Sequence, residues 1–184
     1  MSHPSAFADA ARYQPVECCD YRGVTLPLRF DDLAAETAAA ADRVAVFDRG
    51  DRGLVIATGA DRLSWLHKLV TNAVKTLDTG AGNYAFATDV KGRVQFDLNI
   101  LNRPDALWLD IDAATVPAAL VHLERRLITE DVRLEDATTP FARLACAGPD
   151  ADAVAVRLGV ANFAALPALA SVTLADGAVF VRHD

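Results

Sequence analysis

The segment from Tyr84 to Leu101 has the clearest pattern of apolar and polar positions in the chain. Its second half alternates between an apolar set, Val94, Phe96, Leu98 and Ile100, and a polar set, Arg93, Gln95, Asp97 and Asn99. Successive side chains of a strand point to opposite faces, so the polar set is expected to share one face. The pattern predicts a strand over 84–89, a turn at Val90-Lys91-Gly92 and a second strand over 93–101.

Helical and strand patterns alternate along the rest of the chain. A helix is predicted over 32–43, where Ala, Leu and Glu dominate behind a capping Asp31. Further helices are predicted over 60–70 and 114–126 and from Pro149, and further strands over 53–59, 106–111, 131–134 and 141–146, with two more within 170–182. This mixed order predicts an α+β fold with a mostly antiparallel sheet and packed helices. Residues 1–30 show no periodicity and are predicted to form an N-terminal arm ahead of one domain over 31–184.

Composition narrows the classes of function. The chain has 184 residues and a net charge of −7, and an acidic surface argues against a nucleic-acid partner. No apolar run approaches the roughly 20 residues that a membrane span needs, and the start of the chain lacks a signal-peptide pattern. The three cysteines do not suggest a disulfide framework, and no Cys or His pair has a metal-site spacing. We therefore expect a cytoplasmic protein without a structural metal.

Asp97 lies at the centre of the polar set and is the first candidate for chemistry. One interpretation is that this set forms the solvated face of an antiparallel sheet. The other is that it forms a pocket floor, where a carboxylate accepts hydrogen bonds from a heterocycle or transfers a proton. Tyr84 offers a flat ring and a hydroxyl to an aromatic ligand, or it is a cross-strand aromatic without such a role. Asp110 and Asp112 lie on one side of their strand, either at a site or as a helix cap.

A series of short motifs resembles a known family in order and in spacing. The motifs are Thr-Leu-Pro-Leu-Arg-Phe around Pro27, Val46-Phe47-Asp48, Gly59-Ala60-Asp61, Val70-Thr71-Asn72-Ala73-Val74, Gly80 to Tyr84, Lys91-Gly92-Arg93-Val94, Asp97-Leu98 and Gly148-Pro149. Together they resemble the T-protein (aminomethyltransferase) of the glycine cleavage system and its relatives. Those relatives include folate-dependent demethylases and the YgfZ-type folate-binding proteins. The resemblance covers about 27–150 and implies the first half of that family's folate-binding domain.

The resemblance also implies roles for individual residues. Tyr84 matches a tyrosine that packs on the folate, and Asp97 matches the second residue of an Asp-Asp pair, one member of which is implicated in pterin binding and proton handling. Phe96 stands at the first position of that pair, so its carboxylate is missing here. Asp112 occupies a position where the family often has a ligand-contacting Asn, and Asn72 matches the Asn of the Thr-Asn motif. The predicted catalytic residue is Asp97, and the predicted folate-binding residues are Tyr84, Gln95, Asp97, Asn99, Asp112 and Asn72.

Three functions are compatible with these residues. The first is transfer of a one-carbon (aminomethyl or methyl) unit from a small donor to tetrahydrofolate, which would be the cofactor. The second is non-catalytic folate binding, as the resemblance to YgfZ-type proteins implies. The third is a half-domain subunit that completes its fold with a second subunit or as a homodimer.

Overall fold

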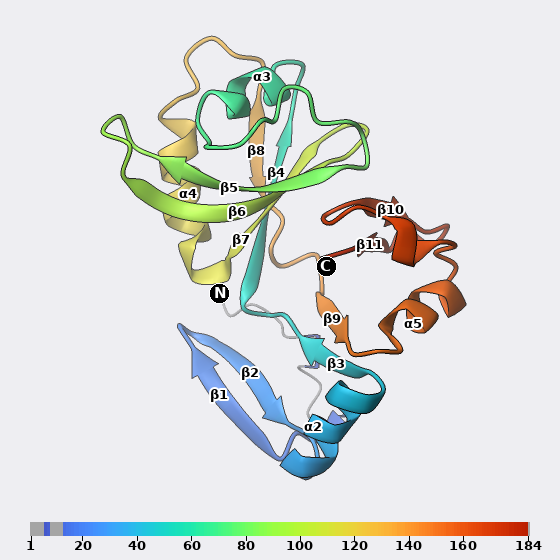
Figure 1. Ribbon diagram of the computed structural model, residues 1–184. Coiled ribbons are helices and arrows are strands. Elements are labelled where there is room, and N and C mark those ends of the chain that lie inside the picture. The colour runs from blue at the N-terminus through green and yellow to red at the C-terminus, as the bar shows by residue number, and fades with distance from the viewer. Residues whose placement is uncertain (1–5, 8–12, 184) are drawn as a thin grey trace. The chain divides into compact units, whose positions relative to one another are not determined.

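The computed structural model describes residues 6–7 and 13–183, and the chain divides into two compact units. The first unit comprises residues 1–52 and 139–164, and the second comprises residues 53–138 and 165–184. The two are described separately below, and Figure 1 labels their elements.

A five-stranded sheet forms the centre of the second unit, in the order β5-β6-β7-β4-β8. The strands are β4 (Arg52–Thr58), β5 (Gly82–Thr88), β6 (Val94–Asn102), β7 (Leu107–Asp112) and β8 (Arg133–Asp136). The β5–β6, β6–β7 and β4–β8 pairs are antiparallel. The predicted hairpin and the predicted α+β fold with a mostly antiparallel sheet are confirmed (Figure 1).

One face of this sheet packs against two helices, α3 (Arg62–His67) and α4 (Val116–Glu124), and we call it the core face. Strand side chains that are at most 1% exposed line it: Val55, Ala57, Ala85, Ala87, Leu98, Ile100, Leu107, Leu109 and Ile111. Trp65 from α3 and Leu123 from α4 close the same cluster. Both helices are shorter than predicted, and a 3₁₀ turn (Ala113–Thr115) precedes α4. Removal of this apolar surface from water is the main stabilising contribution to the unit.

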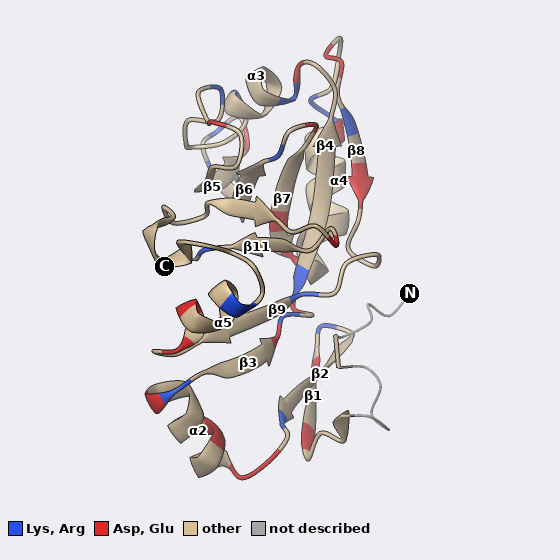
Figure 2. Cartoon of the chain, turned by 90° about the vertical axis from the view of Figure 1, so that its right-hand side faces the viewer, with Lys and Arg blue, Asp and Glu red and all other residues tan. Residues whose placement is uncertain are grey.

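The two edges of the sheet differ. Along β5, the preceding segment 70–73 covers the edge: the Thr71 N–H donates to the Phe86 carbonyl (2.9 Å), and the Phe86 N–H donates to Thr71 Oγ1 (3.0 Å). Asn72 Nδ2 donates to the Tyr84 carbonyl at 2.9 Å. The opposite edge, β8, is short and carries Arg133, Glu135 and Asp136 at exposed positions (Figure 2). At β5 the edge backbone groups are therefore hydrogen-bonded by segment 70–73, and at β8 charged side chains disfavour pairing with another strand.

The C-terminal stretch of the second unit forms the predicted two strands, β10 (Ser171–Thr173) and β11 (Val179–Val181). The Ser171 N–H donates to the Gly80 carbonyl at 2.7 Å. A Cβ at Gly82 would lie 2.5 Å from the Leu169 carbonyl oxygen, so only glycine allows this stretch to approach β5 so closely.

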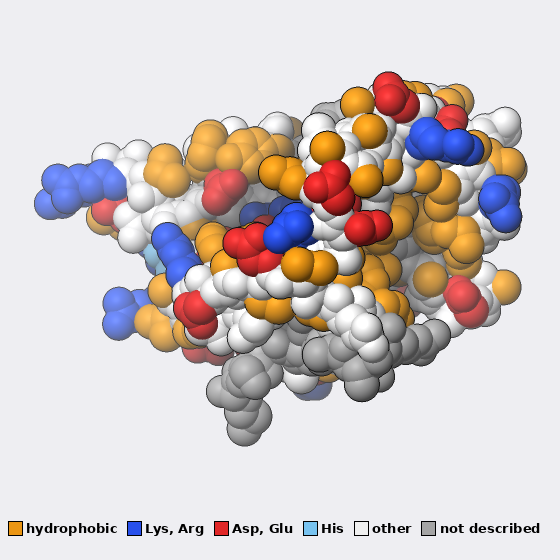
Figure 3. All heavy atoms as spheres, turned by 90° about the horizontal axis from the view of Figure 1, so that it is seen from below, with side chains coloured by type: hydrophobic (Ala, Val, Ile, Leu, Met, Phe, Trp, Pro, Cys, Tyr) orange, Lys and Arg blue, Asp and Glu red, His pale blue; other side chains and the backbone are white. Residues whose placement is uncertain are grey.

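The first unit contains two small sheets and two helices. Its elements are β1 (Glu17–Tyr21), β2 (Val24–Arg29), α2 (Leu33–Asp42), β3 (Ala45–Asp48), β9 (Leu144–Ala147) and α5 (Ala151–Arg157). β3 pairs antiparallel with β9, and no strand had been predicted at β3. Val46, Phe47 and Leu144 of this pair are 49%, 44% and 54% exposed. Figure 3 draws one face of the whole molecule, on which apolar side chains, coloured orange, are numerous.

The prediction of an irregular arm is wrong for residues 17–29, which form the β1–β2 hairpin. Part of the predicted arm, 1–5 and 8–12, lies outside the described residues. The hairpin turns at Arg22 and Gly23, which both have positive φ (53° and 90°), and the Gly23 N–H donates to Asp20 Oδ1 at 3.1 Å. The turn chemistry of Asp, Arg and Gly therefore closes a hairpin whose first strand, β1, lacks a regular apolar alternation.

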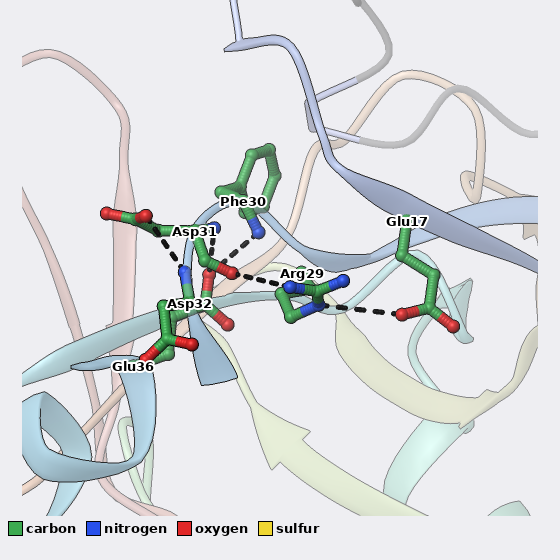
Figure 4. Close-up of polar contacts among 6 residues, drawn as sticks. All are labelled: Glu17, Arg29, Phe30, Asp31, Asp32 and Glu36. Atoms are coloured by element: carbon green, nitrogen blue, oxygen red, sulfur yellow. Dashed lines mark hydrogen bonds and ion pairs between the residues drawn. The ribbon is translucent and has the colours of Figure 1, made fainter. Parts of the chain in front are cut away.

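The connection from β2 into α2 is fixed by short-range polar contacts (Figure 4). Asp32 Oδ2 accepts hydrogen bonds from the N–H groups of Ala34 and Ala35, so Asp32 is the N-cap in place of the predicted Asp31. Glu36 Oε1 accepts from the Phe30 and Asp31 N–H groups at 2.7 and 2.9 Å. The predicted helix over 32–43 is confirmed as α2. Such a cap contributes about 1 kcal/mol to helix stability.

Candidate functional site

A tyrosine and a carboxylate lie together on the sheet face opposite the core. Tyr84 on β5 pairs in register with Asn99 on β6, and its hydroxyl donates to Asp97 Oδ2 at 2.9 Å. Phe86 lies next to Tyr84 on the same face, with ring centroids 5.3 Å apart and edge-on geometry. Tyr84 and Phe86 are 45% and 39% exposed. We call the face that carries Tyr84, Phe86, Asp97, Asn99 and Asp110 the open face.

The open face presents hydrogen-bond acceptors beside these rings. Asn99 pairs in register with Asp110 on β7, and its Nδ2 donates to Asp110 Oδ2 at 3.0 Å. That contact orients the amide so that Oδ1 is the remaining acceptor of Asn99. Within the described part of the chain, neither Asn99 Oδ1 nor Asp97 Oδ1 accepts a hydrogen bond. The sequence prediction for Tyr84, Asp97 and Asn99 thus corresponds to one cluster in space.

Phe96 belongs to the core face, not to the open face. It is 7% exposed, packs in the core cluster and contacts the His122 ring edge-on at 5.6 Å. Neighbouring residues of a strand point in opposite directions, so a carboxylate at position 96 would point away from Tyr84. The missing first Asp of the pair therefore removes no carboxylate from the open face.

Gln95 does not share the open face, which corrects the prediction of four polar residues on one side. Thr88 pairs with Val94 while Ala87 pairs with Phe96, so Gln95 is the additional residue of a β-bulge. Its side chain lines a groove beside α4, and its Nε2 donates to the Arg93 carbonyl at 3.2 Å. Arg93 itself precedes β6, in the turn that follows Asp89. The bulge interrupts the alternation that the prediction assumed.

Asn72 and Asp112 bind backbone groups. Asn72 donates through Nδ2 to the Tyr84 carbonyl and accepts through Oδ1 from the Ala73 N–H at 2.8 Å. Asp112 Oδ1 accepts from the Ala114 N–H at 3.0 Å and caps the 3₁₀ turn, as one of the two sequence interpretations expected. Both side chains organise the margins of the site, and Asn72 fixes the strand that carries Tyr84.

Trp108 and Arg103 were not predicted as part of this region. Trp108 alternates with Asp110 and Asp112 on β7 and pairs in register with Leu101. The Arg103 guanidinium lies 5.4 Å from the Trp108 ring centroid, and its Nη1 donates to Ser171 Oγ at 2.8 Å. Arg103 is only 9% exposed, and this burial lowers the pKa of its guanidinium. The i, i+2 spacing of Trp108 and Asp110 was the sequence signal that could have placed Trp108 here.

The open face offers contacts for a planar heterocycle with N–H donors. Exposed aromatic rings provide stacking area, and a carboxylate accepts stronger, charge-assisted hydrogen bonds. In the described part of the chain, no group of three or more His, Cys, Asp or Glu side chains could hold a metal ion. None of the described helices has the length and apolar character to cross a membrane.

Sequence comparison finds one family model that matches residues 4–178, described as the GCVT N-terminal domain. Among curated proteins, the aminomethyltransferase of Bacillus subtilis (strain 168) is 30% identical over 158 residues, which are 85% of this chain and 43% of that protein. A probable aminomethyltransferase of Halobacterium salinarum is 31% identical over 150 residues, 76% of this chain and 40% of that protein. The chain therefore spans less than half the length of these relatives.

Structural comparison finds a similar fold in the glycine cleavage system aminomethyltransferase T from Bartonella henselae. The TM-score is 0.77 and the sequence identity is 17%, over 94% of this chain and 47% of that structure. At this identity the match supports the fold alone.

Proposed function

Since the chain belongs to the family of the GCVT N-terminal domain, we propose that its open face binds tetrahydrofolate and takes part in one-carbon transfer to it. The observation that carries the proposal is the hydrogen-bonded pair of Tyr84 and Asp97 beside the exposed Phe86 ring. The curated relatives are aminomethyltransferases, and the chain matches less than half of each.

The residues of the open face fit the pterin part of a folate. A pterin is flat and aromatic and carries several N–H donors at its edge. Tyr84 and Phe86 offer ring surface, while Asp97 Oδ1 and Asn99 Oδ1 offer acceptors without a competing partner among the described residues. The Asn99–Asp110 contact holds one acceptor in place before a ligand arrives, which lowers the entropy lost on binding.

Asp97 is the proposed proton-handling group. Tetrahydrofolate supplies the nucleophilic nitrogen that receives the one-carbon unit. Asp97 orients the pterin through Oδ1 and can take or return a proton there, while the Tyr84 hydroxyl holds Oδ2. In this arrangement the chain binds and orients the folate and excludes water from it, which are the main contributions of a protein to cofactor chemistry.

Calorimetry with tetrahydrofolate tests the binding proposal. Asp97→Asn keeps the shape of the side chain but removes its charge, and we expect about 10- to 100-fold weaker binding, because hydrogen bonds to charged groups contribute about 1.5–3 kcal/mol. Asp105→Asn is the matched control, since Asp105 is exposed in a turn of the same unit, and it should bind as the wild type does. Equal affinity of wild type and Asp97→Asn would remove Asp97 from the site. Binding without turnover in the wild type would favour the non-catalytic alternative.

We also propose that a further protein surface completes the pocket. Tyr84 and Phe86 are 45% and 39% exposed on a sheet face, so a planar ligand stacked on them would be covered on one side only, whereas ligand sites usually bury most of the ligand's surface. Light scattering with and without tetrahydrofolate measures whether a second copy associates when the ligand binds. A chain that binds the ligand tightly as a monomer would contradict completion by a second copy.

A further inference from the structure

A groove of about 560 Å³ lies between α4 and the turn that joins β5 to β6, apart from the open face. Its lining includes Asp89 of the turn, the bulged Gln95 of β6, Val121 and His122 of α4, and Arg125 and Arg126, which follow α4. The β-bulge is what turns Gln95 toward this groove. The groove therefore combines two guanidinium groups, an imidazole and the carboxylate of Asp89 in one place.

His122 presents an unused nitrogen there. One ring nitrogen bonds the Thr88 backbone, while Nε2 is buried and has no hydrogen-bond partner among the described residues. Burial lowers the pKa of His122, the nearby charges of Arg126 and Arg125 add to that effect, and the Thr88 bond and Asp89 oppose it. The imidazole is therefore neutral at pH 7, with an acceptor lone pair on Nε2. A buried polar atom without a partner is uncommon in folded proteins, and a bound ligand is one explanation for it.

The two arginines lack carboxylate partners in the described part of the chain, although the protein carries a net charge of −7. Arg126 Nη1 donates to the His122 carbonyl, which leaves its other N–H groups unused, and Arg125 is exposed. Asp89 also lines the groove, so one carboxylate faces two guanidinium groups, but it forms no ion pair with either arginine in the described part of the chain, and its Oδ1 accepts the backbone N–H groups of Lys91 and Arg93 at 2.8 and 3.0 Å. The two guanidinium groups outnumber this carboxylate and are available for an external anion.

We propose that this groove binds a phosphate group, either as inorganic phosphate or as a phosphate monoester. Arg125 and Arg126 donate to the charged oxygens, and His122 Nε2 accepts a hydrogen bond from a protonated phosphate oxygen. The acceptor nitrogen of the imidazole should favour an anion that still carries a proton. A carboxylate or a sulfate has no hydrogen to donate near pH 7, whereas the second pKa of a phosphate monoester is about 6, so a protonated fraction is present. Arginine also matches the fork geometry of phosphate oxygens.

Amide NMR titrations of the wild-type chain at constant ionic strength test the proposal. Inorganic phosphate, glycerol 2-phosphate and sulfate are added separately near pH 6.5. We expect shifts confined to the turn and α4, with millimolar affinity for inorganic phosphate and at least about fivefold weaker affinity for sulfate. Tighter binding of glycerol 2-phosphate identifies the monoester as the ligand, and tighter binding of inorganic phosphate identifies the free ion. Equal affinity for sulfate, or no saturable shift with either phosphate, would overturn the proposal.

Two variants locate the site. Arg125→Met should weaken phosphate binding by about tenfold, because a charge-assisted contact is lost. Arg133→Met, an equal change of charge on the exposed β8 strand of the same unit, should leave the affinity unchanged. His122→Asn should reduce the preference for phosphate over sulfate. If Arg133→Met weakens binding as much as Arg125→Met does, the effect is one of net charge and the groove is not the site.

Discussion

The two faces of the five-stranded sheet are built from the same strands and serve opposite purposes. On the core face, Ala85, Leu98 and Ile100 are at most 1% exposed and pack against α3 and α4. On the open face, the alternate residues Tyr84, Asp97 and Asn99 keep contact with solvent and bond to one another or to a neighbouring strand. The burial that stabilises the unit is thus on one face, and the residues of the proposed folate site are on the other. A substitution in β5 or β6 should affect either stability or ligand binding far more than the other, depending on the face to which its side chain belongs.

The largest effect is expected at Phe96, where an aspartate would restore the Asp pair of the family. Phe96→Asp removes a buried ring and places a carboxylate among apolar side chains, so we expect a loss of at least about 4 kcal/mol of unfolding free energy. Phe86→Asp is the matched control on the open face and should cost about 1 kcal/mol. Urea unfolding measures both. Equal losses would contradict the assignment of Phe96 to the core face.

A smaller effect, on binding and not on stability, is expected at Tyr84. Tyr84→Ala removes the exposed ring and should weaken tetrahydrofolate binding by about tenfold, since a stacked aromatic contributes about 0.5–1.5 kcal/mol beyond its buried area. Tyr84→Phe keeps the ring and loses only the hydrogen bond to Asp97, so it separates stacking from positioning. Calorimetry should find the Phe variant between the wild type and the Ala variant. An Ala variant that binds normally would exclude the ring from the site.

Asn72 supports both the stability of the β5 edge and the position of Tyr84, and the effect expected from its substitution is smaller still. Asn72→Ala removes the side-chain bonds to the Tyr84 carbonyl and the Ala73 N–H, which should lower the unfolding free energy by about 1 kcal/mol. Hydrogen exchange at the amides of 71–73 and of β5 should become faster. Thr79→Ala, at an exposed position outside the strands, is the control and should change neither measurement. Unchanged exchange in the Asn72 variant would show that Thr71 alone holds this edge.

The smallest effect is a pH dependence that originates on the core face. The folded-state pKa of His122 lies below the ordinary value of 6.5, first because of burial and then because of Arg126. As the pH falls below 6.5, the unfolded chain takes up the proton before the folded chain does, so the free energy of unfolding decreases. Above that pH the contribution is complete. In His122→Asn, the free energy of unfolding should depend less steeply on pH between pH 7 and the folded-state pKa of His122. An unchanged slope would show that other groups cause the pH dependence.

Much of the second unit was predictable from sequence because its strands alternate or are uniformly apolar. The turn Val90-Lys91-Gly92 and the alternation in β6 gave the hairpin, and that hairpin brings Tyr84 and Asp97 together. The position of Phe96 in the core follows from the same alternation. The family resemblance singled out Tyr84 and Asp97 as candidate folate-binding residues. The pairing of β5 with β6 then brings their side chains together.

The remaining features depend on contacts that leave no periodic signal. A bulge adds one residue to one strand, and nothing in the residues around Gln95 marks it. β1 and β3 lack a regular apolar alternation, and large apolar residues of β2 and β3, such as Leu28, Val46 and Phe47, are exposed, so neither pattern marks a buried strand face. Asn72 and Asp112 were predicted to bind folate, and their partners in the structure are backbone groups, which a pattern of side chains does not reveal.

The guarded edges of the sheet also restrict how the protein can assemble. Segment 70–73 already occupies the free side of β5, and charged side chains flank β8, so strand addition from another molecule meets either a filled edge or uncompensated charge. Growth by edge pairing, the route to fibrils and strand exchange, is therefore disfavoured at both ends. A partner that completes the site would have to approach across the open face and associate through side chains, so its complex should remain dissociable and stoichiometric.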